Sequence, residues 1–198
     1  YNRPVSYNRR YSGEIGNIKS SLTNYISKIT NDGGYNTNEI AFFNEYDPYI
    51  HSNAPWLSIM AYNAYVMNPT TFNSAGYGSK FVGLMNSATQ GFSEYEIIEK
   101  GGVDEFNVNF GGNLSDMLYW GVALGVSSID QSRYMYYGEG LTSANVPSES
   151  LTGDPIDKNG TASFGLENWL TTTGDAFNFK FGVIFKPINE LRIGASFH

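Results

Sequence analysis

The sequence contains no cysteine among its 198 residues. A disulfide framework and a thiolate metal site are therefore both excluded. It also lacks any run of about 18 apolar residues, which excludes a transmembrane helix. This second absence does not bear on membrane-spanning strands, because their apolar residues alternate with polar ones and give only a weak hydropathy signal.

Charged residues are scarce, at 16% of the chain against about 25% in a typical soluble domain. The formal net charge is -7, and no cluster of Lys and Arg occurs anywhere in the sequence. Nucleic-acid-binding proteins present basic patches. The composition therefore argues against nucleic acid as a partner, and we expect none.

Motifs for catalysis or cofactor binding are also missing. The sequence has no Gly-x-Ser-x-Gly elbow, no Walker A loop and no dinucleotide-binding glycine pattern. Its two histidines, His51 and His198, lie far apart. Asp154 and Asp157 faintly resemble the start of a calcium loop, but the EF-hand spacing and its final Glu are absent. We therefore expect no enzymatic activity, no cofactor and no metal site.

Aromatic residues and glycine are abundant, with 15 Tyr, 13 Phe and 22 Gly. This mixture suits the wall of an outer-membrane barrel, which combines aromatic belts, a polar interior and long polar loops. On composition alone, a soluble β-sandwich is the alternative.

Two segments alternate with the two-residue period of strands. Each consists of two strands joined by a short turn, near Asn113 in the first and near Pro187 in the second. One face of these hairpins is apolar, and we expect it to contact lipid: Phe106, Val108, Phe110, Trp120, Val122, Leu124, Val126, Phe177, Phe179, Phe181, Val183, Phe185, Leu191, Ile193, Ala195 and Phe197. The opposite face carries mainly small and polar residues, and we expect it to line a barrel interior: Glu105, Asn107, Asn109, Tyr119, Gly121, Ala123, Gly125, Asn178, Lys180, Gly182, Arg192, Gly194, Ser196 and His198.

The connections alternate in length. The pattern predicts a long loop at 12–91, a strand hairpin at 92–128, a second long loop at 129–173 and a second hairpin at 174–198. Outer-membrane barrels alternate short periplasmic turns with long extracellular loops in this way. We therefore predict an all-β fold that forms part of an antiparallel transmembrane barrel.

The first long loop contains two amphipathic helical patterns. The first covers about residues 16–30 and ends at Gly33-Gly34, since glycine supplies a helix C-cap. The second follows Pro55, presents Trp56, Ile59, Met60 and Met67 on one stripe, and stops before Pro69. The second long loop is rich in Ser, Thr, Gly, Pro and Asp, and we expect at most a short helix there, at 164–170.

The two hairpins resemble the FadL-type transporters of long-chain fatty acids and other hydrophobic compounds. The first reads DEFNVNFGGNLSDMLYWGVALGVSSI and is similar to the family's strand, Asn-centred turn and returning strand. The second reads FNFKFGVIFKPINELRIGASFH and resembles the family's "K-G-ifrP-e-lRiG-a-h" hairpin. The opening YNRPVSYNRR looks like the end of another family strand.

The resemblance implies a fourteen-strand barrel in the bacterial outer membrane, plugged by an N-terminal hatch. Because the chain opens without Met and closes inside a strand pattern, we expect it to be an internal part of such a protein. The family also implies passive uptake of a hydrophobic molecule. Apolar helices in an extracellular loop capture the ligand, which then enters the barrel and leaves through an opening in its wall.

Six residues are the candidate ligand contacts under this resemblance. Trp56, Ile59, Met60 and Met67 would form the capture surface, with packing between the two helices as the alternative. Lys180 and Arg192 would face the interior, where cations hold a carboxylate. For these two the alternative is an ion pair with Glu105 or Glu190.

Two other functions are compatible with the sequence. The chain could be a structural or assembly subunit of an outer-membrane protein complex with no transported ligand, which an interior blocked by bulky side chains would favour. A soluble β-rich binding module is the second, which solubility of the folded chain without detergent would favour.

Overall fold

The computed structural model describes residues 1–148 and 154–197, so the expected place of His198 on a strand lies outside the described residues. Contacts divide the chain into two compact units, which we describe separately. The sheet unit comprises Tyr1–Tyr11, Glu96–Met135 and Glu167–His198. The lobe unit comprises Ser12–Tyr95 and Tyr136–Leu166.

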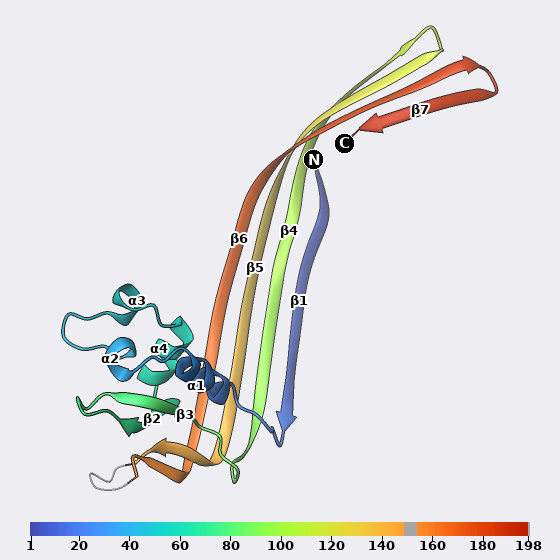
Figure 1. Ribbon diagram of the computed structural model, residues 1–198. Coiled ribbons are helices and arrows are strands. Elements are labelled where there is room, and N and C mark those ends of the chain that lie inside the picture. The colour runs from blue at the N-terminus through green and yellow to red at the C-terminus, as the bar shows by residue number, and fades with distance from the viewer. Residues whose placement is uncertain (149–153, 198) are drawn as a thin grey trace. The chain divides into compact units, whose positions relative to one another are not determined.

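Five strands form one sheet in the order β1-β4-β5-β6-β7 (Figure 1). Their bounds are β1 Asn2–Gly16, β4 Gln90–Leu114, β5 Leu118–Pro147, β6 Ile156–Ile188 and β7 Leu191–Phe197. Strands β1, β4, β5 and β6 contribute residues to both units. The expectation of a mainly antiparallel β fold is confirmed.

The sheet unit contains both predicted hairpins. Between β4 and β5 the chain turns at Ser115 and Asp116, which both adopt positive φ angles, 53° and 56°. Asn113 stabilises this turn, since its Oδ1 accepts a hydrogen bond from the Asp116 N–H at 2.9 Å. Strands β6 and β7 pair antiparallel, with Phe181 opposite Phe197 and Phe185 opposite Ile193.

The prediction of a second long loop at 129–173 is wrong. Strand β5 continues to Pro147 and β6 begins at Ile156, so strands occupy nearly all of this segment that the structure describes. The short helix expected at 164–170 is likewise part of β6. Its side chains are stabilised by contacts distant in sequence: the rings of Tyr137 and Phe164 lie 6.5 Å apart. Residues 149–153, which belong to the same prediction, lie outside the described residues.

In its described residues, the lobe unit contains four helices and a two-stranded sheet. Helix α1, Leu22–Asp32, confirms the first predicted helix, although it begins later because Ser21 is its N-cap. The short helices α2, Thr37–Ile40, and α3, Pro48–His51, were not predicted. Helix α4, Trp56–Asn63, follows Pro55 as predicted but ends sooner. Met67 therefore opens β2, Met67–Phe72, which pairs with β3, Gly78–Gly83.

Two asparagines of α1 bind the main chain at and just beyond β3. Asn31 donates to the Phe81 carbonyl at 2.8 Å and accepts from the Phe81 N–H at 2.9 Å. Asn24 makes the same pair of bonds with Met85, at 2.8 and 3.0 Å. Seven residues separate the two asparagines, so they project from one face of the helix. Their amides satisfy main-chain groups that would otherwise be buried without partners.

Two apolar clusters form the core of the lobe unit. The first contains Ile26, Ile40, Ile59, Ala61, Met67 and Phe81. The second contains Leu84, Leu141 and Ala144, with Ala162 and Phe164 packed against it. Because Leu141 lies on β5 and Phe164 on β6, the second cluster joins the helical insertion to the long strands of its own unit.

Close packing of α1 against β3 requires glycine at position 83. A Cβ there would collide with the main chain of Thr23 and Asn24. We predict that Gly83→Ala lowers the opening free energy of α1 amides by about 1–3 kcal/mol, as measured by hydrogen exchange. Gly16→Ala is the matched control, since a Cβ at Gly16 meets no atom within 4 Å. Equal exchange in the two variants would contradict this account of the packing.

Candidate functional site

The sheet unit presents an exposed apolar face. Three observations define its two faces. Glu105, Ser127 and Asn178 share one face, because the Asn178 amide donates to Glu105 Oε1 at 3.1 Å and to Ser127 Oγ at 2.6 Å. A Cβ at Gly125 would collide with Asn107 Oδ1, which adds these two residues to the same face. The alternate residues of each strand therefore lie on the opposite face.

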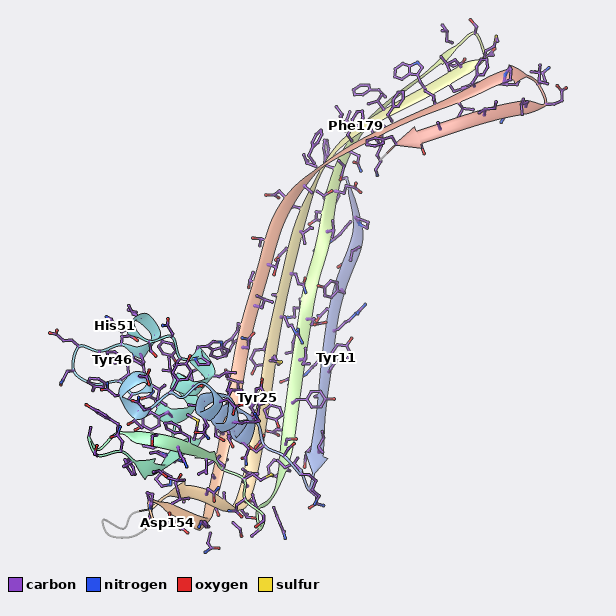
Figure 2. The ribbon with its side chains drawn as sticks, in the orientation of Figure 1. Tyr11, Tyr25, Tyr46, His51, Asp154 and Phe179 are labelled. Carbon is purple, nitrogen blue, oxygen red and sulfur yellow. The ribbon has the colours of Figure 1, made fainter. Side chains whose placement is uncertain are left out.

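That opposite face carries twelve large apolar side chains whose exposed fractions range from 40% to 70%. They are Phe106, Val108, Phe110, Trp120, Leu124, Val126, Phe177, Phe179, Phe181, Phe185, Ile193 and Phe197. We call this set the apolar face; Phe179 is labelled on it in Figure 2. The predicted division of the two hairpins into an apolar and a polar face is thus confirmed.

Small residues recur on the polar face, where glycine or alanine occupies positions 121, 123, 125, 182 and 194. A cavity of about 900 Å³ lies near the hairpin turns. Its lining includes Asn109, Lys180 and Ser196 of the polar face and Trp120 and Phe181 of the apolar face. This part of the sheet therefore leaves room for a molecule the size of a small ligand.

Lys180 and Arg192, the two predicted cations, differ in their partners. Lys180 Nζ lies 3.9 Å from Glu105 Oε1, which is the ion pair that the sequence offered as the alternative to carboxylate binding. Arg192 is exposed on β7 and makes no ion pair within the described part of the chain. Of the two, Arg192 is the cation whose charge is not already balanced.

The predicted capture stripe divides into two exposed and two buried residues. Trp56 and Met60 are 51% and 39% exposed, one turn apart on α4. Ile59 and Met67 are 1% and 0% exposed and pack in the first apolar cluster. The prediction that Ile59 and Met67 belong to a capture surface is therefore wrong. The hydrophobic effect buries these two side chains in the core of the lobe unit.

A buried carboxylate that the sequence did not reveal fixes the start of α1. Glu139, on β5, is 3% exposed. Its Oε1 accepts hydrogen bonds from the Leu22 N–H and from the Tyr137 hydroxyl, each at 2.8 Å. The first N–H groups of a helix have no partner within the helix, and the helix dipole favours an anion there. Glu139 thus holds the helical insertion on the strands of the lobe unit.

Among the described residues, no helix has the length and apolar character needed to cross a membrane. Nor does that part of the chain contain a group of three or more His, Cys, Asp or Glu side chains placed to hold a metal ion. Asp154 accepts a hydrogen bond from the Ile156 N–H and pairs with Lys158, and these contacts lower the pKa of its carboxyl.

Comparisons with known proteins give no further assignment. No known protein family, curated protein or solved structure matches this chain.

The pKa of the Tyr137 hydroxyl depends on its hydrogen bond to Glu139. Burial and the neighbouring Glu139 carboxylate raise the pKa of Tyr137 to about 12, from an ordinary value near 10. The pKa of Tyr137 is thus higher in the folded chain than in the unfolded one. The free energy of unfolding that the Tyr137–Glu139 hydrogen bond contributes is therefore complete below about pH 10 and is lost as the pH rises to about 12.

We predict that Tyr137→Phe removes one phenol titration near pH 12 from the ultraviolet absorbance titration of the folded chain. Glu139→Gln should shift this titration toward 10, because it removes the carboxylate charge while retaining an acceptor oxygen. A difference titration between wild type and Tyr137→Phe that is centred on pH 10 would show that the contact does not form.

Proposed function

We propose that this chain contributes part of the wall, and an external helical lobe, to a bacterial outer-membrane β-barrel that takes up a hydrophobic small molecule by passive diffusion. The exposed apolar face carries this proposal. The resemblance of the two hairpins to FadL-type transporters supplies the ligand class, a long-chain fatty acid or a similar compound. Outer-membrane lipid and other outer-membrane proteins would be the partners of the wall.

The length of the apolar face suits a membrane. Its residues run from Phe177 to Phe185 on β6, which is nine residues, and from Trp120 to Val126 on β5, which is seven. At about 3.3 Å per residue, nine residues span roughly 26–30 Å. A membrane-spanning strand needs about 9–11 residues, and the apolar band of outer-membrane barrels is about 25 Å tall.

Exposure of this face argues against a soluble binding module. Soluble monomers rarely expose contiguous apolar patches larger than a few hundred Å². Here twelve large side chains share one face of the sheet and no second layer covers them within the described residues. Lipid would remove this surface from water at no cost to the fold.

The polar face supports passage of a ligand over a purely structural role. Bulky side chains on the polar face would block the barrel interior and favour a purely structural role. Glycine and alanine instead occupy five positions of this face on β5, β6 and β7. Arg192 remains as the cation that would hold a carboxylate, while Lys180 is paired with Glu105. Trp56 and Met60 would provide the first apolar contact, outside the membrane.

Substitutions on opposite faces of β5 test the position of the wall. Val122 lies midway along the apolar segment, and Ala123 lies beside it on the other face. We predict that Val122→Lys destabilises the membrane-inserted form by about 2–4 kcal/mol, because a cation near the bilayer midplane faces lipid. Ala123→Lys, at the same depth, should cost much less. Reversible unfolding from lipid vesicles measures both, and equal costs would refute the orientation.

Replacing both Trp56 and Met60 with Ser tests the capture role. Burying one such side chain against an alkyl chain is worth about 1.5–3 kcal/mol. We therefore predict at least tenfold weaker binding of a labelled long-chain amphiphile, with assembly intact, in an equilibrium titration. Tyr65→Ser is the control, since Tyr65 is a large exposed residue just beyond α4. Unchanged affinity in the double variant would assign capture to another surface.

A further inference from the structure

The segment from α2 to α4 exposes a row of aromatic rings. Phe43 and Tyr46 stack with centroids 4.8 Å apart, and Tyr46 stacks on His51 at 5.4 Å. Beside them, Phe42 and Tyr49 lie 5.8 Å apart. Figure 2 labels Tyr46 and His51 in this segment. We call Phe42, Phe43, Tyr46, Tyr49 and His51 the aromatic surface.

The aromatic surface adjoins the predicted capture residues. The Phe42 N–H donates to Asn63 Oδ1 at 3.4 Å. Asn63 lies three residues after Met60 on α4, so it projects from the helix near Met60. Asn63 also donates to the Ile40 carbonyl at 2.8 Å, which joins α4 to α2. Met60 and the aromatic surface therefore belong to one continuous region of the lobe unit.

The charge of this region has one sign. Between Lys28 and Lys80 the sequence contains no Lys or Arg, but it contains Asp32, Glu39, Glu45 and Asp47. Two of these carboxylates serve the fold, since Glu39 completes the capping box of α2 and Asp47 caps α3. Glu45, between Phe43 and Tyr46, makes no hydrogen bond or ion pair with any other residue that the structure describes. Its charge is therefore not balanced within the lobe.

From this arrangement we propose that the aromatic surface recognises a small organic cation, of the aryl-alkylammonium class, with Glu45 as its counter-charge. A cation is attracted to the negative face of an aromatic ring, and the exposed Glu45 carboxylate between Phe43 and Tyr46 adds a solvent-screened attraction. Asp32 is balanced by its ion pair with Lys28, so an anion at the aromatic surface would meet the carboxylates of Glu39, Glu45 and Asp47, with no Lys or Arg in the same segment. The proposal rests on the proposed uptake function and specifies the charge of the compound that the lobe captures first.

The aromatic surface and Arg192 would differ in the ligand charge that they favour. An acidic amphiphile would gain only apolar contact with Trp56 and Met60, whereas a cationic one would also gain the rings and Glu45. Binding at the aromatic surface and binding at Arg192 would thus favour ligands of opposite charge. Long-chain fatty acids are then poorer ligands for the lobe than cations of equal apolar area.

The test compares three probes with one phenylpropyl group and different head groups: phenylpropyl-trimethylammonium, phenylpropanol and phenylbutyrate. Each is titrated calorimetrically into the full chain in uncharged maltoside micelles at pH 8, with empty micelles as the blank. We expect the cation to bind roughly two- to fivefold tighter than the alcohol, and the carboxylate to bind most weakly. Glu45→Gln should reduce the preference for the cation without changing the affinity for the alcohol.

Glu14→Gln is the matched control, because Glu14 is an exposed carboxylate of the same unit outside the aromatic surface. It should leave all three affinities unchanged. If the carboxylate binds as tightly as the cation, or Glu45→Gln retains the full preference, the cation proposal is overturned while hydrophobic uptake stands. If none of the three probes binds above the micelle blank, the capture role of the lobe and the cation proposal both fail.

Discussion

The alternation of side chains along a pleated strand is the constraint on which the rest of the structure depends. Because successive residues point to opposite faces, the sequence of one strand defines two surfaces of different polarity. On β6 the odd-numbered residues from Phe177 to Phe185 are apolar, while Asn178, Lys180 and Gly182 lie between them. A shift of one residue in register would exchange the faces. The hydrogen bonds of Asn178 to Glu105 and Ser127 fix that register by joining three strands.

The same alternation explains how strands β5 and β6 serve both units. In the sheet unit the face that carries Ser127 is polar and open. In the lobe unit, Tyr137, Glu139 and Leu141 continue this alternate set along β5, and here the insertion covers it. Glu139 supplies the polar attachment at Leu22, and Leu141 supplies an apolar one. The sequence of β5 thus defines which of its residues contact the helical insertion and which it leaves uncovered.

Local patterns in the sequence predicted the parts of the fold that depend on neighbours in the chain. Both hairpins and α1 follow from alternation, helical periodicity and turn residues. In the segment 129–173, the Ser, Thr, Gly and Asp residues suggest turns, whereas partners such as Tyr137 and Phe164 stabilise it as strands. An apolar stripe does not reveal where a helix ends, so the sequence places Met67 on a helix although it opens β2. Contacts between distant residues, such as Glu139 with Leu22, leave no periodic signal.

We propose that the apolar face contacts lipid. Because the chain contains no cysteine, this contact can be measured directly with single cysteines introduced along a strand. Single cysteines placed at each position from Leu118 to Ser128 can be labelled with a fluorophore in vesicles that contain a quencher attached to the lipid tails. We expect strong quenching at even-numbered positions from 118 to 126, little quenching at odd-numbered positions, and weaker quenching at Ser128 than at Val126. Uniform quenching along the strand, or none, would contradict it.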